Sequence, residues 1–437
     1  MTPTDTQAPA GKEASPTPDA QRPAPSYKWA VVGMLWFICF FNYADRQAIF
    51  SIFPVLESQF GFNKEQLGRI GAAFTIVYAV TAPFAGQVGD RFARKAVILG
   101  GLYIWSLVTG FTALCSKVWQ FVLVRGAEGL GETFYFPASM SLISDYHTRA
   151  TRSRAMSLHQ TSVYAGTIGG GALAGWMAQQ FGWRSPFLVF AVAGVLLGLA
   201  LAAFIREPQR NEAERLEQGA LTEESVPPQL PMSQFLRDLA RTPTALTLIV
   251  AFFGANLVAL VFLTWMPSFL KEKFHLNLAQ AGLGATVFIQ LASMIGATFG
   301  GVLADRWRRQ MAGGRILTQA LGAILGAPFI FLCGYTRDLW TLVGAMTLFG
   351  LCKGLYDANI WASLYDVVAP SRRGAAVGLM NMIGWLGGAL GAYAIGAAVQ
   401  GGMTMSAAIS STALIYVAVA ALLVTGALVF APRDVRS

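Results

Sequence analysis

The sequence predicts an all-α membrane protein in which twelve transmembrane helices form two pseudo-symmetric six-helix bundles. Of the 437 residues, 54% are hydrophobic and only 13% are charged, whereas charged residues make up about 25% of a typical soluble domain. Long apolar stretches recur along the chain, and sequence motifs of its first half are repeated in its second half. This composition excludes a disordered protein and most soluble enzymes.

A helix that crosses a bilayer needs about 20 apolar residues, and twelve stretches reach this length. They cover residues 28–56, 66–89, 94–115, 117–144, 152–180, 185–205, 243–271, 279–304, 313–335, 338–367, 373–399 and 405–431. Lipid offers no partners to backbone groups, so each stretch is expected to be a helix. A β-barrel is disfavoured because its strands are about ten residues long and alternate in polarity.

Polar segments divide the chain. Residues 1–26 hold six prolines and no apolar core, which predicts a disordered cytoplasmic tail rather than a signal peptide. Residues 206–242 mix glutamates, arginines and prolines, which predicts a cytoplasmic linker. This linker separates a bundle over 27–205 from a bundle over 243–431, and residues 432–437 form a second cytoplasmic tail.

The net charge of +9 is interpreted as membrane topology, not as nucleic-acid binding. If both termini are cytoplasmic, the cytoplasmic segments hold 22 of the 32 Lys and Arg residues and the outer loops with their helix ends hold seven. Basic residues concentrate on the cytoplasmic side of membrane proteins. We therefore expect a multi-pass protein of the cell (inner) membrane with both termini inside. The three remaining basic residues, Arg46, Arg125 and Lys353, lie within the membrane.

The two halves share a motif. Residues 86–94 and 301–309 both have the pattern G-x-x-x-D-R-x-x-R, and they follow the second and the eighth predicted spans. A second spacing, of 221 residues, relates several further pairs. These pairs are Trp119 and Trp340, Gly129 and Gly350, Asp145 and Asp366, and Arg152 and Arg373. Internal repeats of this kind are typical of transporters with a binding site between the halves.

The repeated motif resembles the signature of the major facilitator superfamily, and the resemblance covers residues 28–431. It implies the major facilitator fold and a secondary active transporter that works by alternating access, not an enzyme, with no cofactor. In that family the motif latches the cytoplasmic side shut in the outward-open state. The matching gating residues are Asp90, Arg91, Arg94, Asp305 and Arg306.

Ionisable side chains at membrane depth cost at least about 2.5–3.5 kcal/mol each, so they indicate function. The first span carries Asp45 and Arg46, and the fourth carries Arg125, Glu128 and Glu132 on one helical face. The tenth span carries Lys353 and Asp357, and Lys353 matches Glu132 in the 221-residue repeat.

A static ion-pair network is the structural alternative. It suits Arg125 with Glu128 and Lys353 with Asp357, since each pair lies one turn apart. It suits Asp45 and Arg46 less well, because adjacent helical residues point about 100° apart. Arg46 then needs another anion, and a substrate carboxylate would suit its planar guanidinium.

Asp-Arg in the first span, with Arg-x-x-Glu-x-x-x-Glu in the fourth, resembles the anion:cation symporter branch of the superfamily. That resemblance implies proton coupling through Asp45 and Glu132, with Arg46 gripping an organic anion and Arg125 as its partner. The same features also resemble the spinster-like branch, which transports or exports lysolipids or sphingolipids.

The expected burial of Asp45 and Glu132 supports their role as proton carriers independently of the family resemblance. Desolvation raises a carboxyl pKa and a nearby arginine lowers it, so an acid held between these influences can change protonation as a gate opens. Sodium coupling is the alternative, but no unwound, carbonyl-rich segment is visible in the sequence.

Further side chains at suitable depth are candidates to line a substrate cavity. They are Tyr78, Gln160, Tyr164, Asn256, Gln290, Lys353, Tyr356, Asp357, Asn381 and Trp385. The four cysteines lie in apolar stretches without metal-ligand spacing, so no metal is expected.

The leading hypothesis is proton-coupled symport of a small organic anion, such as a sugar acid or another carboxylate, by a monomer embedded in membrane lipid. A membrane sensor that uses a transporter fold is the hypothesis from another class, but the linker of 206–242 leaves little room for a signalling domain.

Overall fold

The computed structural model describes residues 26–209, 212, 232–369 and 372–435. Residues 1–25 of the predicted tail, most of the predicted linker (210–211 and 213–231) and residues 436–437 therefore lie outside the described residues. Within the described ranges every regular element is a helix. The prediction of an all-α protein is confirmed.

Eight helices precede the linker. They are α1 (Tyr27–Ser51), α2 (Phe53–Phe60), α3 (Lys64–Arg91), α4 (Arg94–Thr112), α5 (Val118–Thr133), α6 (Tyr135–Tyr146), α7 (Arg149–Phe181) and α8 (Ser185–Phe204). After the short helix α10 (Met232–Ala240), a second set follows. It comprises α11 (Pro243–Phe274), α12 (Leu278–Gly284), α13 (Val287–Arg308), α14 (Gly314–Tyr335), α15 (Leu339–Asp357), α16 (Ile360–Val367), α17 (Arg373–Gln400), α18 (Met405–Thr425), the π-helical turn η2 (Gly426–Phe430) and α19 (Ala431–Asp434).

Each of the twelve predicted stretches is occupied by one helix or by consecutive short helices. Among the described residues, nine helical segments are long and apolar enough to cross a membrane. The stretches of α1, of α5 with α6, and of α7 are outside this set. Their polar side chains lower the hydropathy, and several of those side chains belong to the site described below.

Two spans break directly after a charged residue. Helix α5 ends at Thr133, just after Glu132, and α15 ends at Asp357. Pro137 explains the first break, because proline has no N–H to donate to the carbonyl of Thr133 four residues earlier. The breaks place the predicted charged residues at helix ends in the middle of each span.

Helix packing explains why glycine occurs at both Gly129 and Gly350, which are equivalent in the 221-residue repeat. A Cβ atom on Gly129 would lie 2.5 Å from the carbonyl oxygen of Phe74 in α3, and one on Gly350 would lie 2.6 Å from that of Ile289 in α13. Only glycine allows the paired helices to approach this closely. The same close contact therefore brings α5 onto α3 and α15 onto α13.

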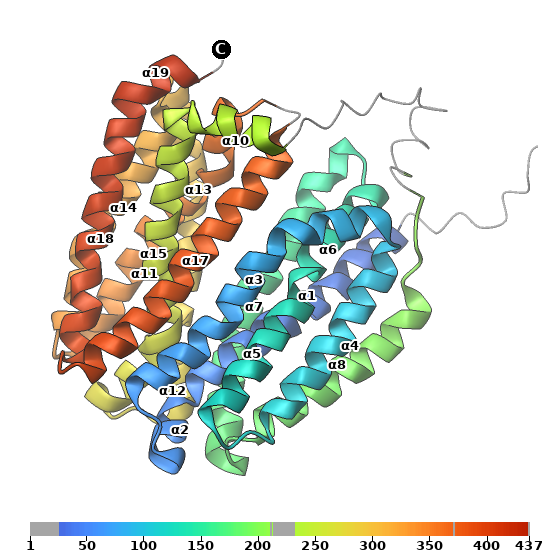
Figure 1. Cartoon of the computed structure of the whole chain (residues 1–437), viewed down its shortest axis with the longest axis vertical. Helices are drawn as coiled ribbons and strands as arrows, with labels where there is room; N and C mark the ends of the chain where they lie inside the picture. Colours follow the sequence, from blue (N-terminus) through green and yellow to red (C-terminus); the bar gives the residue numbers. More distant parts are fainter. Residues whose placement is uncertain (1–25, 210–211, 213–231, 370–371, 436–437) are drawn as a thin grey trace, which may run out of the picture.

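The two sets of helices meet at one end of the molecule and diverge toward the other (Figure 1). The start of α1, the end of α8, α10 and the C-terminus lie at the diverging end, here named the linker end. Helices α2 and α12 lie at the opposite end, here named the closed end. There, Gly171 of α7 packs against the backbone of Gly282 in α12, so that two glycines let the halves touch.

Candidate functional site

A cavity of about 510 Å³ lies between the two halves. All predicted substrate-binding residues except Tyr78 and Tyr356 line it. The lining members of that set are Arg46, Arg125, Gln160, Tyr164, Asn256, Gln290, Lys353, Asp357, Asn381 and Trp385. The structure thus brings together, around one space, side chains that are up to 339 positions apart in the sequence (46 to 385).

Arg46 lies in a cage of aromatic rings. Its guanidinium carbon is 4.6 Å from the ring centre of Tyr43, 4.8 Å from that of Phe74 and 4.7 Å from that of Tyr78. Trp385 of the other half is 5.8 Å away and also contacts the ring of Tyr78. Cation–π contacts hold a guanidinium in place while leaving its N–H groups free to bind an anion. Tyr78 therefore acts on Arg46 rather than on the cavity itself.

The guanidinium of Arg46 is shared between a buried acid and the cavity. Its Nε donates to Oε2 of Glu132, while its Nη1 has no partner among the described residues. Arg46 also lines the cavity. An anion entering the cavity would therefore meet a cation whose position is already set by Glu132 and the rings.

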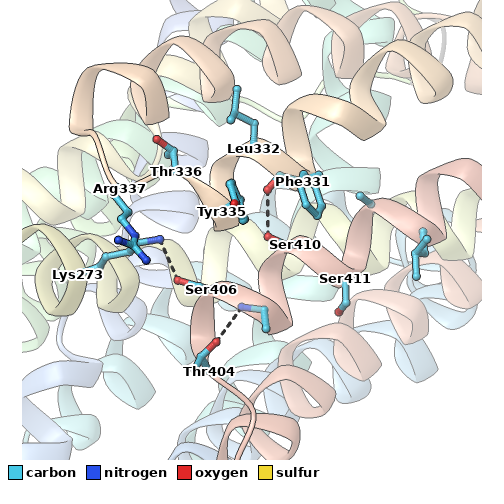
Figure 2. Close-up of a pocket in the computed structure, with 13 residues that line it drawn as sticks. Lys273, Phe331, Leu332, Tyr335, Thr336, Arg337, Thr404, Ser406, Ser410 and Ser411 are labelled. Atoms are coloured by element: carbon cyan, nitrogen blue, oxygen red, sulfur yellow. Dashed lines mark hydrogen bonds between the residues drawn. The ribbon is translucent and has the colours of Figure 1, made fainter.

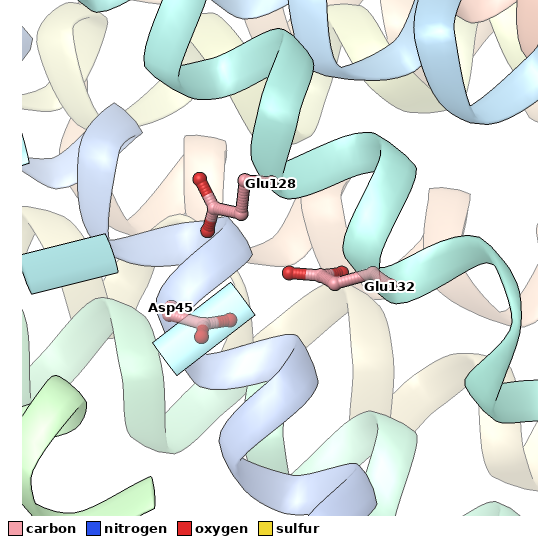
Figure 3. Close-up of side chains that lie close together, drawn as sticks. All are labelled: Asp45, Glu128 and Glu132. Atoms are coloured by element: carbon pink, nitrogen blue, oxygen red, sulfur yellow. The ribbon is translucent and has the colours of Figure 1, made fainter. Parts of the chain in front are cut away.

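Glu132, the acid that pairs with Arg46, lies close to two other acids, Asp45 and Glu128 (Figure 3). Oxygen atoms of Asp45, Glu128 and Glu132 all lie within 4.8 Å of one another, and each residue is at most 3% exposed. Arg125 donates to Glu128. The hydroxyl of Thr109 lies 3.3 Å from Oδ2 of Asp45 and 3.5 Å from Oε1 of Glu128, so it can donate to either.

The charges of this cluster do not balance. With Arg46 and Arg125 as its cations, three ionised carboxylates would leave one net negative charge. Two like charges 4.8 Å apart repel by about 3–4 kcal/mol at an effective dielectric constant of 20. One added cation would balance the cluster. A single proton is sufficient for this balance, and Asp45 Oδ1 and Glu132 Oε1 are buried carboxylate oxygens without a hydrogen-bond partner among the described residues.

The second half contributes a more accessible ion pair. Lys353 donates to Asp357 one turn later in α15, and their side chains are 19% and 32% exposed. The Arg125 and Glu128 side chains are only 2% and 1% exposed. The pair on the second half is thus the one that a substrate in the cavity can reach directly.

Tyr356 does not line the cavity. It is 1% exposed and lies among the buried side chains, and its hydroxyl has no partner within the described residues. Its neighbour Asp357 takes the cavity-facing side of the helix instead, since successive residues point about 100° apart.

Two of the predicted gating residues, Arg94 and Asp305, pair within their own halves. Arg94 pairs with Asp145 and lies 2.8 Å from Glu207. Asp305 lies 3.2 Å from Arg315, which is also 2.8 Å from Asp366. Arg306 is exposed. The side chains of Asp90 and Arg91 lie outside the described residues.

These ion pairs show which residues are equivalent in the two halves. Arg94 with Asp145 and Arg315 with Asp366 are both related by 221 residues (94 to 315 and 145 to 366). Arg315, not Arg309 of the motif, is therefore the structural counterpart of Arg94. The motif spacing of 215 residues hides this because the second half has six extra residues after its acid.

The closed end is joined by side chains that were not among the predicted functional residues; of these, Lys64 was expected only to mark the outer side of the membrane. Lys64 at the start of α3 pairs with Glu272 of the second half and, at 2.6 Å, with Glu57 of its own half. The hydroxyl of Tyr393 donates to Glu65 at 3.2 Å, and Nε2 of Gln47 donates to the carbonyl of Leu263 at 3.0 Å. These contacts form an interface between the halves that is closed in this structure.

Replacing Glu272 by glutamine should loosen this interface, because, of the two ion pairs that Lys64 makes, the one with Glu272 crosses between the halves. Glu57→Gln is the matched control, since it removes the pair that Lys64 makes within its own half. Partly exposed pairs contribute up to about 1 kcal/mol, so we expect a roughly two- to five-fold rise in opening. The readout is labelling of a cysteine at Asn256 in a cysteine-free background, using an impermeant thiol reagent applied from the closed end. Equal labelling in both variants would contradict a role for Glu272 in closure.

The sequence model of the Major Facilitator Superfamily matches residues 35–392 and, in a second match, 268–437. The chain belongs to the major facilitator superfamily. Its fold, a multi-pass helical membrane protein, agrees with this assignment.

Relatives from both predicted branches are similar to the chain. The probable galactarate/D-glucarate transporter of Bacillus subtilis is 26% identical over 391 residues, covering 85% of each chain. Human protein spinster homolog 1 is 28% identical over 402 residues, covering 85% of this chain and 73% of that protein. The inward-facing, unoccupied crystal structure of a bacterial homolog to the human lysosomal transporter spinster superposes with a TM-score of 0.82 at 18% identity. That superposition covers 95% of this chain and all of the other, and it shows a common fold.

Proposed function

We propose that this protein is a proton-coupled symporter of a small organic anion, working by alternating access. The single observation that carries the proposal is the position of Arg46. It faces the cavity, is held by aromatic rings from both halves, and pairs with an acid in a cluster that has one more carboxylate than guanidinium groups.

Proton and anion binding are coupled in this proposal through the contact between Arg46 and Glu132. While Glu132 is ionised, its carboxylate competes with a substrate carboxylate for the guanidinium. A proton on Glu132 weakens that contact, and Arg46 can then offer two parallel N–H groups to the substrate. Asp45, within 4.8 Å of Glu132, takes or shares the proton.

The other polar residues that line the cavity favour a substrate that is a polyhydroxylated acid. Amide side chains of Gln160, Asn256, Gln290 and Asn381 offer both donors and acceptors. The reachable Lys353–Asp357 pair adds a charged donor and a charged acceptor on the second half. A sugar acid has one end for Arg46 and hydroxyl groups for these partners, and relatives carry the names of sugar-acid transporters.

Both halves must hold the substrate for alternating access to work. In the proposed topology the linker end is cytoplasmic, so closure at the opposite end corresponds to an inward-open state of the inner-membrane protein. The motif residues Asp90, Arg91, Arg94, Asp305 and Arg306 would then join across the linker end in the opposite state.

A spinster-like lysolipid transporter is the second candidate, supported by relatives such as human spinster homolog 1. The aromatic residues around Arg46 could hold an alkyl chain as well as a sugar ring. Charged and amide groups on both walls favour the smaller, more polar substrate, because each would lose water without gaining a partner beside a lipid chain.

Counterflow in proteoliposomes tests the proposal. Vesicles are loaded in turn with unlabelled sugar acids, aromatic acids or lysolipids, and uptake of the matching labelled compound is measured. We expect counterflow with at least one sugar acid and none with the corresponding neutral sugar. Counterflow restricted to lysolipids would contradict the proposal and establish the second candidate.

A further inference from the structure

A second and larger cavity, of about 950 Å³, lies away from the cavity between the halves. It is a groove between α14 and α18 at the closed end, with the end of α11 at its mouth (Figure 2). None of the residues that line it lines the central cavity. The groove therefore needs an explanation separate from the transport site.

The walls of the groove are apolar and face outward. Phe331 and Tyr335 of α14 and Leu414 of α18 line it, and they are 50%, 70% and 73% exposed. In a protein that spans a membrane, large apolar side chains exposed on an outer helix face contact lipid. The groove is therefore open to the acyl-chain region of the bilayer.

The mouth of the groove is basic. Nζ of Lys273 donates to the carbonyl of Gly334 at 2.8 Å and to the hydroxyl of Ser406 at 2.9 Å, which fixes the ammonium between α14 and α18. Arg337 lies beside it, in the connection after α14 (Figure 2). The neighbouring cations of Lys273 and Arg337 repel each other, so an anion bound between them would be stabilised.

No acid of the described chain supplies that anion. Neither Lys273 nor Arg337 has an ion pair among the described residues, and the partners of Lys273 are neutral. Two acids are adjacent in sequence to these cations. Glu272, next to Lys273, pairs with Lys64. Asp338, next to Arg337, caps α15: its Oδ2 accepts from the amide of Thr341 at 2.7 Å and from the hydroxyl at 2.9 Å. These two bonds lower the pKa of Asp338, so its charge is committed to the helix cap.

The size of the groove matches one lipid leaflet. Leu414 is nine residues beyond Met405, the start of α18, which corresponds to about 14 Å along the helix. Half of a bilayer hydrocarbon core is about 15 Å thick. The basic mouth thus lies at headgroup level, and the apolar walls extend to about the depth of one acyl chain.

We propose that this groove binds an anionic glycerophospholipid, with its phosphate between Lys273 and Arg337 and an acyl chain along Phe331, Tyr335 and Leu414. Basic pockets between transmembrane helices bind anionic headgroups, and each basic side chain near the surface contributes about a five-fold gain. The lipid is a structural ligand of the second half, so its binding is independent of what the central cavity transports.

Photo-cross-linking tests the proposal on the full-length protein in phosphatidylcholine vesicles. A phosphatidylglycerol probe carries its photoreactive group on the acyl chain, and cross-linked peptides are mapped by mass spectrometry. We expect labelling of 331–335 and 407–414, competed by unlabelled phosphatidylglycerol but not by extra phosphatidylcholine or inorganic phosphate.

Arg337→Gln is the decisive variant, because Arg337 is exposed in a connection and its loss leaves the helix packing intact. We expect it to reduce this labelling about five-fold, and Lys273→Gln to do the same. Lys271→Gln is the matched control: it removes a cation from the same end of α11 that does not line the groove. Equal labelling in Arg337→Gln and Lys271→Gln, or equal competition by the two lipids, would overturn the proposal.

Discussion

Replacing Arg46 by lysine is expected to weaken binding of the transported anion about ten- to a hundred-fold, although the charge is retained. Arg46 uses Nε for Glu132 and has a further guanidinium nitrogen, Nη1, without a partner among the described residues, whereas lysine has one nitrogen for both the acid and the anion. A charged hydrogen bond of this kind contributes about 1.5–3 kcal/mol. Substrate binding to the purified protein and counterflow on the same preparation measure the effect.

Arg69→Lys is the control for this variant. Arg69 pairs with Glu65 at the closed end, is more than half exposed and does not line the cavity, so its replacement should leave affinity unchanged. If Arg46→Lys bound the anion as tightly as the unmodified protein, Arg46 would be a structural member of an ion pair and not the substrate clamp.

Replacing Glu132 by glutamine should separate exchange from accumulation. The amide keeps the shape of the side chain but cannot release a proton, so uptake driven by a pH gradient should be lost. Counterflow should persist, because exchange does not require the empty, deprotonated carrier to return. Asp45→Asn should behave similarly, since the two acids lie in one cluster.

A purely structural Glu132 would give another pattern. Loss of its contact with Arg46 would lower protein yield and reduce exchange and pH-driven uptake together. Both assays on one proteoliposome preparation distinguish these outcomes. Full pH-driven accumulation by Glu132→Gln would leave Asp45 as the remaining candidate for the coupling residue.

Much of the fold could be predicted because bilayer thickness dictates the length of an apolar helix. Charged residues within those stretches could also be predicted as functional residues, because burying a charge in a membrane is costly and such residues are rarely kept without a function. Ten polar or aromatic residues that line the cavity were predicted in this way, whereas its other aromatic lining, such as Phe252 and Phe349, was not. Tyr356 shows where the prediction failed. Its depth along the helix was predicted, but not that it lies on the face of α15 that packs against neighbouring helices.

Pairings between distant residues could not be predicted. Lys64 and Glu272 are 208 positions apart, and nothing local distinguishes them from other basic and acidic residues near helix ends. The counterpart of Arg94 was likewise hidden, because six extra residues in the second half displace Arg315 from the motif. The aromatic cage of Arg46 depends on three helices, α1, α3 and α17, meeting at one point.

Proton movement in proteoliposomes tests proton-coupled anion symport most directly. Vesicles are prepared in lightly buffered, sodium-free medium, the sugar acid that supports counterflow is added outside, and external pH is recorded. Symport predicts that the medium becomes more alkaline as anion and protons enter together, and that Glu132→Gln abolishes this change. Anion uptake without any pH change, or uptake that appears only when sodium is added, would contradict proton coupling.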